Sequence, residues 1–292
     1  MIKIGAHISS AGSIDLSFDR AKEMGAECMQ IFISPPQMWV KPEISPQKIE
    51  RFRKKAEESG IGPNFIHGVY LANLATSSPE SLEKSIDWLR FSLKTADILG
   101  LKGTIIHVGS HKGSGFAGCL KQVAQAIKEI LDSSNSSFSY LILENCAGSG
   151  GTIGCNFNEL GQILKQVRSD LIGVQDDRLK VCLDTQHAFA SGYDLRTEEG
   201  VWKTLQEFDQ EIGLENLIAI HANDSKTELG SKKDRHENIG QGLIKEAGFR
   251  FLIKALQTNP KVSDVVLLLE VPGLEGKGPD KPNLDLLKSY LK

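Results

Sequence analysis

Short apolar runs alternate with longer amphipathic segments along most of this 292-residue chain. The runs are almost continuously apolar, which is typical of strands buried on both faces of a parallel sheet. The pattern predicts eight strands: Lys3–Ala6, Cys28–Phe32, Asn64–His67, Gly103–His107, Tyr140–Glu144, Lys180–Asp184, Leu217–His221 and Asp264–Glu270.

The segments between the runs have the boundaries expected of helices. The clearest follows Ser45-Pro46, covers Gln47–Ser59 and ends before Gly60, and another runs from Ser78-Pro79 to Gly100. Serine at the N-cap, proline in the first turn and glycine after the last turn are the usual signals. Further helices are predicted over Ser13–Gly25, Phe116–Asp132, Phe157–Gln166, Glu198–Ile212, Ala247–Gln257 and Leu284–Leu291. Eight strands alternating with eight helices predict one α/β domain over residues 1–292, a (β/α)8 TIM barrel.

Nearly every predicted strand ends at a residue that can bind a metal ion. The endings are His7, His67, His107, Glu144, Asp184, His221 and Glu270. From Gln30 to His221 the series advances by alternating steps of 37 and 40 residues, which fits a repeated strand-helix unit. The last step is about ten residues longer, and its extra loop contains Asp234 and His236. Because the carboxyl ends of all strands lie on one face of such a barrel, we expect the active site on that face.

The candidate ligands are five imidazoles and four carboxylates. In the segment Asp184-Thr185-Gln186-His187 a carboxylate at a strand end is followed three residues later by an imidazole in a loop. Nine such groups at one barrel mouth would repel one another or remain poorly solvated without a cation. Mixed nitrogen and oxygen ligands favour zinc or manganese over magnesium or copper. The full set is His67, His107, Glu144, Asp184, His187, His221, Asp234, His236 and Glu270.

Each of the two other histidines has more than one possible role. His7 either supports a ligand, faces the substrate or is structural, and His111 either reaches a phosphate or caps its loop. The five cysteines are scattered without a Cys-x-x-Cys pair, so neither disulfides nor a cysteine zinc site is indicated. Two of them, Cys28 and Cys182, lie in predicted strands, where a reduced cysteine acts as a small apolar side chain.

Charge and hydropathy add two expectations. The formal net charge of −3 argues against an anionic partner, but three divalent cations would change it by six units to +3. No run of 18 apolar residues occurs, and the amino-terminal segment is too short for a signal sequence. We therefore expect a cytoplasmic protein without membrane association.

Several motifs together resemble the endonuclease IV family of apurinic/apyrimidinic (AP) endonucleases, within the xylose isomerase-like barrels. The match covers nearly the whole chain. The most specific pieces are Leu183–Asp194 and the stretch from His221 to Asp234-Arg235-His236, and the others are Gly5-Ala6-His7, His67 with Tyr70–Leu74, His107 with Gly109-Ser110-His111, Leu143-Glu144-Asn145 with Ala147-Gly148, and Glu270.

The resemblance implies three zinc ions, with manganese as an option at one site. It implies three ligand sets: His67, His107 and Glu144; Glu144, Asp184, His221 and Glu270; and His187, Asp234 and His236. It also implies base excision repair chemistry. Metal-bound hydroxide would attack the phosphodiester 5′ to an abasic site in duplex DNA and leave a 3′-hydroxyl and a 5′-deoxyribose phosphate. Glu144 would fix the metal pair and Glu270 would orient the hydroxide.

The resemblance also implies DNA contacts and a monomer without protein partners. Tyr70 and Leu71 match positions that fill the gap left by a flipped-out, baseless sugar. Pro35 and Gln37 stand where family members often have Asn and Arg, and Gln37 cannot supply a guanidinium. In the basic loop next to the third ligand set, cationic side chains are candidates for phosphate contact: Lys226, Lys232, Lys233 and Arg235. Gln186 replaces an expected Cys.

Two alternatives remain open at this point. One is a sugar isomerase or epimerase on the same barrel, using two metals and Glu144 or Glu270 as proton carrier. It predicts activity on free ketoses and none on abasic DNA. The other is a non-catalytic, metal-stabilised protein that binds damaged DNA. The third ligand set, His187, Asp234 and His236, favours the endonuclease, because two-metal sugar chemistry does not need it.

Overall fold

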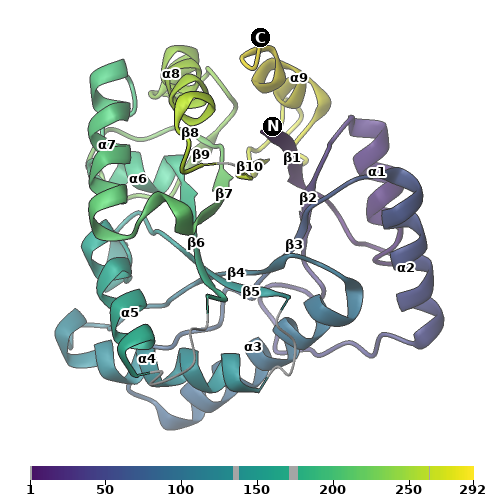
Figure 1. The fold of residues 1–292 in the computed structure, drawn as a ribbon, viewed down its shortest axis with the longest axis vertical. Helices are drawn as coiled ribbons and strands as arrows, with labels where there is room; N and C mark the ends of the chain where they lie inside the picture. The colour runs from purple at the N-terminus through teal and green to yellow at the C-terminus, as the bar shows by residue number, and fades with distance from the viewer. Residues whose placement is uncertain (1, 134–137, 171–176, 263) are drawn as a thin grey trace.

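Eight parallel strands close into a barrel in the computed structural model, which describes residues 2–133, 138–170, 177–262 and 264–292 (Figure 1). Hydrogen-bonded neighbours follow in the order β1-β2-β3-β4-β5-β6-β7-β10, and β10 pairs with β1 to close the ring. The predicted (β/α)8 barrel is therefore confirmed. The strands are β1 (Lys3–His7), β2 (Met29–Ile31), β3 (Asn64–His67), β4 (Gly103–His107), β5 (Tyr140–Glu144), β6 (Leu179–Asp184), β7 (Leu217–His221) and β10 (Val266–Leu269).

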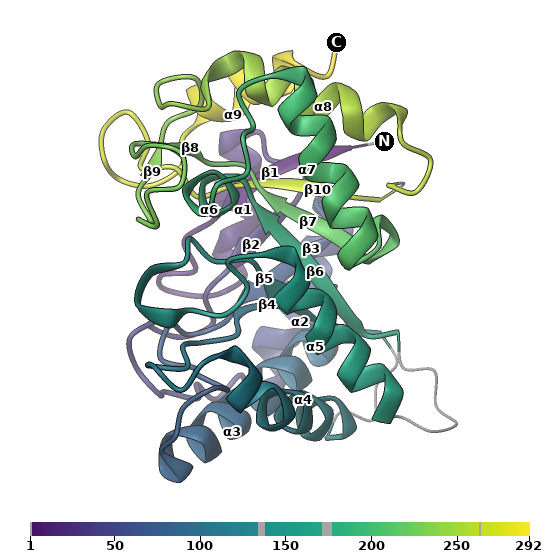
Figure 2. The same cartoon turned by 90° about the vertical axis from the view of Figure 1, so that its left-hand side faces the viewer.

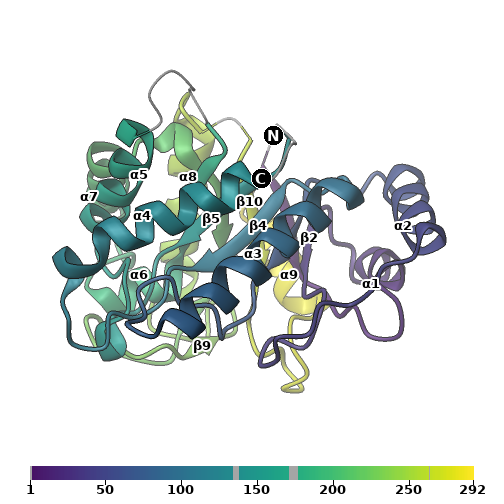
Figure 3. The ribbon, with the colours of Figure 1, turned by 90° about the horizontal axis from the view of Figure 1, so that it is seen from below.

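Helices form the outer layer around this barrel (Figure 3). The Ser45 and Ser78 side chains accept the backbone N–H groups of Lys48 and Ser81, which confirms both predicted N-caps. Gly60 ends its helix with a φ of 65°, a left-handed conformation that glycine adopts without strain. The helices are α1 (Leu16–Met24), α2 (Pro46–Ser59), α3 (Pro79–Leu99), α4 (Phe116–Asp132), α5 (Phe157–Asp170), α7 (Glu198–Glu211), α8 (Lys245–Thr258) and α9 (Lys281–Ser289).

Some short elements differ from the predictions. His187 was expected in a loop, but it lies in the helix α6 (Thr185–Ser191), which is too short to show helical periodicity. Two 3-10 turns, η1 (Ser149–Gly151) and η2 (Leu214–Asn216), were not predicted either. The long loop after β7 pairs with itself through β8 (Asp224–Ser225) and β9 (His236–Glu237). Figure 2 shows α6, β8 and β9 together at one end of the barrel.

The last predicted strand, Asp264–Glu270, is wrong at both ends, because β10 covers only Val266–Leu269. Glu270 follows the strand, and its backbone N–H donates to the Asn223 side chain rather than to the sheet. The single domain over residues 1–292 stays a prediction, since that range includes residues outside the described ones. Among the described helices, none is long and apolar enough to cross a membrane.

The barrel interior has two layers of side chains that explain the spacing of the sequence. The lower layer is a buried cluster that includes Cys28, Phe65, Ile105, Ile142, Cys182, Ala219 and Leu268. Two positions further along the chain from each of these stand Gln30, His67, His107, Glu144, Asp184, His221 and Glu270. Since residues i and i+2 of a strand face the same side, the second set forms a polar layer above the apolar one, at the carboxyl ends. Strand register places His107 beside Glu144 and Asp184 beside His221.

Candidate metal centre

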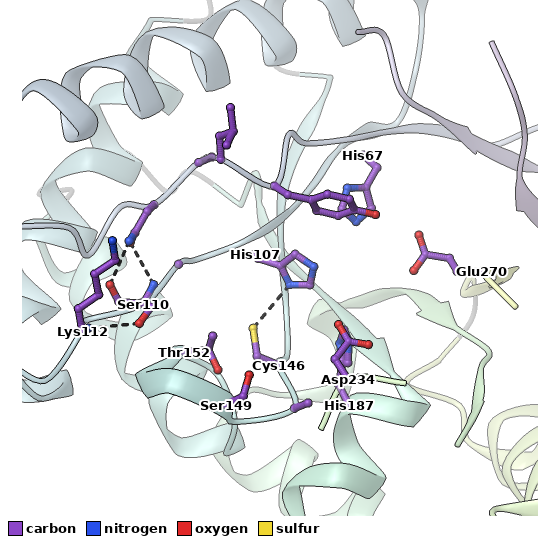
Figure 4. Close-up of a pocket in the computed structure, with 16 residues that line it drawn as sticks. His67, His107, Ser110, Lys112, Cys146, Ser149, Thr152, His187, Asp234 and Glu270 are labelled. Carbon is purple, nitrogen blue, oxygen red and sulfur yellow. Dashed lines mark hydrogen bonds and ion pairs between the residues drawn. The ribbon is translucent and has the colours of Figure 1, made fainter. Parts of the chain in front are cut away.

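The polar layer adjoins a cavity of about 570 Å³ at the barrel mouth (Figure 4). His67, His107 and Glu270 of this layer line the cavity, together with His187 from α6 and Asp234 from the loop before β9. Figure 4 shows these five side chains facing one shared space. The remaining ligand candidates of the layer, Glu144, Asp184 and His221, are buried with no exposed surface.

The first predicted ligand set comes together around Glu144. Its Oε2 lies 3.4 Å from His67 Nε2 and 3.7 Å from His107 Nε2. These separations are long for hydrogen bonds. They are close to the edge of a tetrahedron, about 3.4 Å, for ligands about 2.1 Å from a zinc ion. The geometry of His67, His107 and Glu144 therefore suits a shared cation.

The second set converges on His221. Its Nδ1 lies 3.0 Å from Glu144 Oε1, 3.3 Å from Glu270 Oε2 and 3.9 Å from Asp184 Oδ2. In this set and in the first, each residue has one ligand atom within 4.8 Å of those of the others. Glu144 contributes to both sets through different oxygens. Two adjacent cation sites bridged by this carboxylate are consistent with that arrangement.

The third set is His187, Asp234 and His236. Asp234 lies between the two rings, with Oδ2 3.3 Å from His187 Nε2 and Oδ1 3.3 Å from His236 Nε2. Asp184 also comes within 3.8 Å of His187 Nδ1 and 3.7 Å of His236 Nε2, so it competes with Asp234 as the carboxylate of this set. His187 Nδ1 donates to the Asn145 carbonyl at 2.9 Å, which leaves Nε2 as its free ligand atom. Asp184, His187 and His236 also have one ligand atom each within 4.8 Å of those of the others. Because Nε2 of His187 faces Asp234, the predicted set with Asp234 stays the prediction that we carry forward.

Buried polar atoms and charge both fit bound cations. Glu144 Oε2 and His236 Nε2 are buried, and neither makes a hydrogen bond within the described part of the chain. Burial opposes the charged form of Glu144, but neighbouring His107 and His221 outweigh it and hold the pKa of this carboxyl well below its usual range. Burial likewise lowers the pKa of His187, yet Asp184, Asp234 and Glu144 raise it well above the ordinary value. Positive charge beside these buried carboxylates is therefore favourable, and divalent cations would supply it.

The far side of each histidine ring decides which nitrogen is free. Nδ1 of His67 and of His236 donates to the carbonyls of Gly68 and Glu270, at 2.8 and 3.3 Å. Nδ1 of His107 lies 3.5 Å from the Cys146 sulfur, the contact drawn in Figure 4. These rings, like His187, therefore present Nε2 to the site, as metal-binding histidines with a supported Nδ1–H do. The ring of His221 has the opposite orientation, because it presents Nδ1 to Glu144 and Glu270.

Amide side chains that the sequence reasoning did not assign hold the carboxylates in place. Asn145 Oδ1 accepts the backbone N–H of Asp184 at 2.6 Å. Asn223 Nδ2 donates to Asp184 Oδ2 at 2.7 Å, and its Oδ1 accepts the N–H of Glu270 at 2.8 Å. The available signal was position: Asn145 directly follows a strand-end ligand, and Gln30 belongs to the regular spacing series.

The predicted DNA-contact residues divide into two groups. Tyr70 and Leu71 line the cavity and are 54% and 38% exposed, which is unusual for large apolar side chains and fits a surface wedge. Gln37, Lys226 and Arg235 are exposed but are not among the residues that line this cavity. Arg235 Nη1 donates to the Asp234 carbonyl at 2.6 Å. Their contacts with DNA remain predictions.

The two uncertain histidines have clear surroundings. His111 Nδ1 accepts the backbone N–H groups of Gly113 and Gly115, both at 3.1 Å, so this ring caps its loop. His7 Nδ1 lies 3.1 Å from Gln30 Nε2 and 3.5 Å from Glu270 Oε1. Burial, the largest influence, lowers the pKa of His7. His7 Nδ1 is therefore placed to accept from Gln30 Nε2, and the ring stands behind Glu270 rather than among the ligands.

The closed barrel described above agrees with the comparisons, because the model of the xylose isomerase-like TIM barrel family matches residues 18–290. A protein of Natronomonas pharaonis named "Probable endonuclease 4" is 40% identical over 277 residues, covering 95% of this chain and 94% of the relative. The crystal structure of endonuclease IV from Thermus thermophilus superimposes with a TM-score of 0.83 at 32% identity, covering 99% of this chain and 98% of that one. The chain therefore belongs to the endonuclease IV family and is an endonuclease.

A D-tagatose 3-epimerase-like protein shares the fold at a TM-score of 0.74 and 20% identity, covering 99% of this chain and 97% of that one. At that identity the likeness concerns the barrel alone. It carries no support for the sugar-isomerase alternative.

Proposed function

We propose that this chain is a zinc-dependent AP endonuclease of base excision repair. It hydrolyses the phosphodiester 5′ to an abasic site in duplex DNA and leaves a 3′-hydroxyl and a 5′-deoxyribose phosphate. Family membership supports the endonuclease activity, and the third ligand set supports the three-metal form of it. That set, with both oxygens of Asp234 3.3 Å from the free nitrogens of His187 and His236, is the observation that carries the proposal.

The residues present fit three zinc ions in the predicted sets, with manganese as an alternative at one of them. When bound, the ions supply Lewis acidity, which makes hydroxide available near neutral pH and neutralises charge on the attacked phosphate and the departing oxygen. Glu144 holds two sets at a fixed separation, because its two oxygens face different histidines. Glu270 Oε2 lies beside His221, while its carboxyl group borders the cavity, so it is placed to orient the attacking water.

Substrate selection would rest on the cavity and its rim. An abasic nucleotide lacks a base, so its sugar and phosphate can enter a 570 Å³ cavity once they leave the helix. Tyr70 and Leu71 then occupy the space left in the base stack, since apolar wedges between base steps stabilise a kinked duplex. Their exposure at the cavity edge supports this role. Lys226 and Arg235 are proposed to contact phosphates of the same duplex, where their charge would make binding salt-dependent.

The test is cleavage of an end-labelled duplex that carries one tetrahydrofuran abasic analogue, by protein whose bound metals have been counted. The proposal predicts a single cut immediately 5′ of the lesion, a product that a DNA polymerase can extend, and no cut after chelation. Protein that holds its metals but leaves this duplex intact would contradict the proposal. Conversion of a free ketose would then establish the epimerase alternative, and tight binding without turnover the damage-binding one.

A further inference from the structure

One member of the polar layer is not a ligand type. Gln30 is the middle residue of β2 and lies at the level of the histidines and carboxylates, and it has no exposed surface. Burying a primary amide is costly unless both of its ends are hydrogen-bonded. Here both ends are bonded, and all of the partners belong to the site: His221, Glu270 and His7.

The oxygen of Gln30 explains why the His221 ring is reversed. Oε1 lies 2.8 Å from His221 Nε2. An amide oxygen can only accept, so Nε2 carries a proton, and in the neutral ring that binds a cation the lone pair is on Nδ1. That Nδ1 faces Glu144 Oε1 at 3.0 Å and Glu270 Oε2 at 3.3 Å. Among the five candidate ligand histidines, His221 is the one whose far nitrogen is held by a side-chain amide.

The nitrogen of Gln30 acts on Glu270. Nε2 donates one hydrogen to Glu270 Oε1 and lies 3.1 Å from His7 Nδ1, which can accept the other. The opposite amide orientation would place Oε1 against a carboxylate oxygen, so the direction of the amide is fixed. Glu270 is thereby left with Oε2 toward His221 Nδ1. One amide selects the free atom of two members of the second ligand set.

We propose that Gln30 is a positioning residue for the second metal site: its two ends set the tautomer of His221 and the free oxygen of Glu270. The inference rests on the proposed function, because it assumes that this set binds a cation. Partners of this kind typically contribute 10- to 100-fold, roughly, to metal affinity or activity. We expect a loss of that size at one of the three ions when the amide is removed.

Two substitutions separate the roles of the amide. Gln30→Met keeps the length of the side chain and removes both the hydrogen-bond acceptor and the donor. Gln30→Glu keeps an acceptor for His221 Nε2 but replaces the donor to Glu270 by a second carboxylate. Gln122→Met is the matched control, because Gln122 also donates twice, to the carbonyls of Leu74 and Thr76 at 2.9 Å, and none of these partners is a candidate ligand.

The readouts are cobalt titration followed by visible absorption, and nitrogen-15 spectra of the histidine rings. Wild type should bind three equivalents of cobalt and show His221 protonated at Nε2. Gln30→Met should bind one equivalent ~10- to 100-fold more weakly and lose the single tautomer, whereas Gln30→Glu should keep the tautomer and still bind that equivalent weakly. Gln122→Met should match wild type in both.

Zinc-loaded wild-type protein with His221 protonated at Nδ1 would overturn the inference even if no variant folds. Unchanged cobalt affinity and tautomer in folded Gln30→Met would overturn it as well, while leaving the proposed function intact. Failure of wild type to bind cobalt or zinc at all would instead refute the proposed function, so the two failures are distinguishable.

Discussion

Replacing Glu144 by glutamine perturbs two metal sites at once. The substitution keeps the size of the side chain and removes one negative charge from a position with no exposed surface. Its oxygens lie 3.0 to 3.7 Å from ring nitrogens of His67, His107 and His221. A unit charge about 4 Å from another contributes on the order of 4 kcal/mol at an effective dielectric constant near 20. Because about 1.4 kcal/mol is a factor of ten, we expect each of the two bridged ions to bind roughly 1000-fold more weakly.

The assay combines metal counting by mass spectrometry with single-turnover cleavage of the abasic duplex. Glu144→Gln should retain about one ion of three and lose cleavage by a factor of roughly 1000 or more, and both Glu144→Ala and His107→Ala should abolish cleavage in folded protein. Glu159→Gln is the matched control, because this carboxylate accepts the Gly154 N–H at 2.7 Å without belonging to any ligand set. A Glu144→Gln protein that keeps three ions and wild-type turnover would refute the reasoning.

Three further predictions concern metal removal, the cavity rim and pH. Chelation should lower the midpoint of thermal unfolding by roughly 20 °C, because three ions held at 1000-fold their dissociation constants stabilise the native state by about 4 kcal/mol each, or about 12 kcal/mol together. An unchanged midpoint in differential scanning fluorimetry would show that bound ions do not stabilise the fold. Tyr70→Ala should leave the fold intact, since Tyr70 is 54% exposed. It should reduce kcat/KM on the abasic duplex roughly 10- to 100-fold, because base stacking on the ring is lost. A kcat/KM equal to that of wild type would show that Tyr70 does not take part in substrate recognition. Burial raises the pKa of Asp280, but N–H donors from Leu274 and Asn283 outweigh it and leave the pKa below the ordinary value. The ionised Asp280 carboxylate therefore stabilises the fold above its unfolded-state pKa of about 4, and this stabilisation is lost as the pH falls through the folded-state pKa. Asp280→Ala should lower the free energy of unfolding by about 1 kcal/mol at pH 7 and by a decreasing amount below pH 4, as measured by denaturant unfolding. A loss that stays the same at every pH would contradict the pKa shift.

The sequence predicted the barrel well where an apolar run ends abruptly at a charged or imidazole side chain. The bounds of β3, β4, β5 and β7 agree with the predicted ranges for this reason, because the polar layer begins where the apolar interior stops. It predicted less well where local pattern is weak. The helix α6 has only seven residues, and β10 ends one residue before Glu270, because Asn223 takes the hydrogen bond that would have extended it.

The ligand sets could be predicted as residue types but not as atoms. Which nitrogen of His221 is free depends on Gln30, which is 191 positions away along the chain and meets it only through the closed barrel. The role of Asn223 likewise depends on two carboxylates, Asp184 and Glu270, that precede and follow it by 39 and 47 positions. Such contacts leave no periodic trace in the sequence.

The most direct test of the central claim is anomalous X-ray diffraction at the zinc edge from crystals of zinc-loaded protein. The account predicts three anomalous peaks: one among His67, His107 and Glu144, one between Glu144 and His221, and one among His187, Asp234 and His236. A third peak held by Asp184 in place of Asp234 would correct the third ligand set. The absence of any peak at the barrel mouth in zinc-loaded crystals would contradict the account.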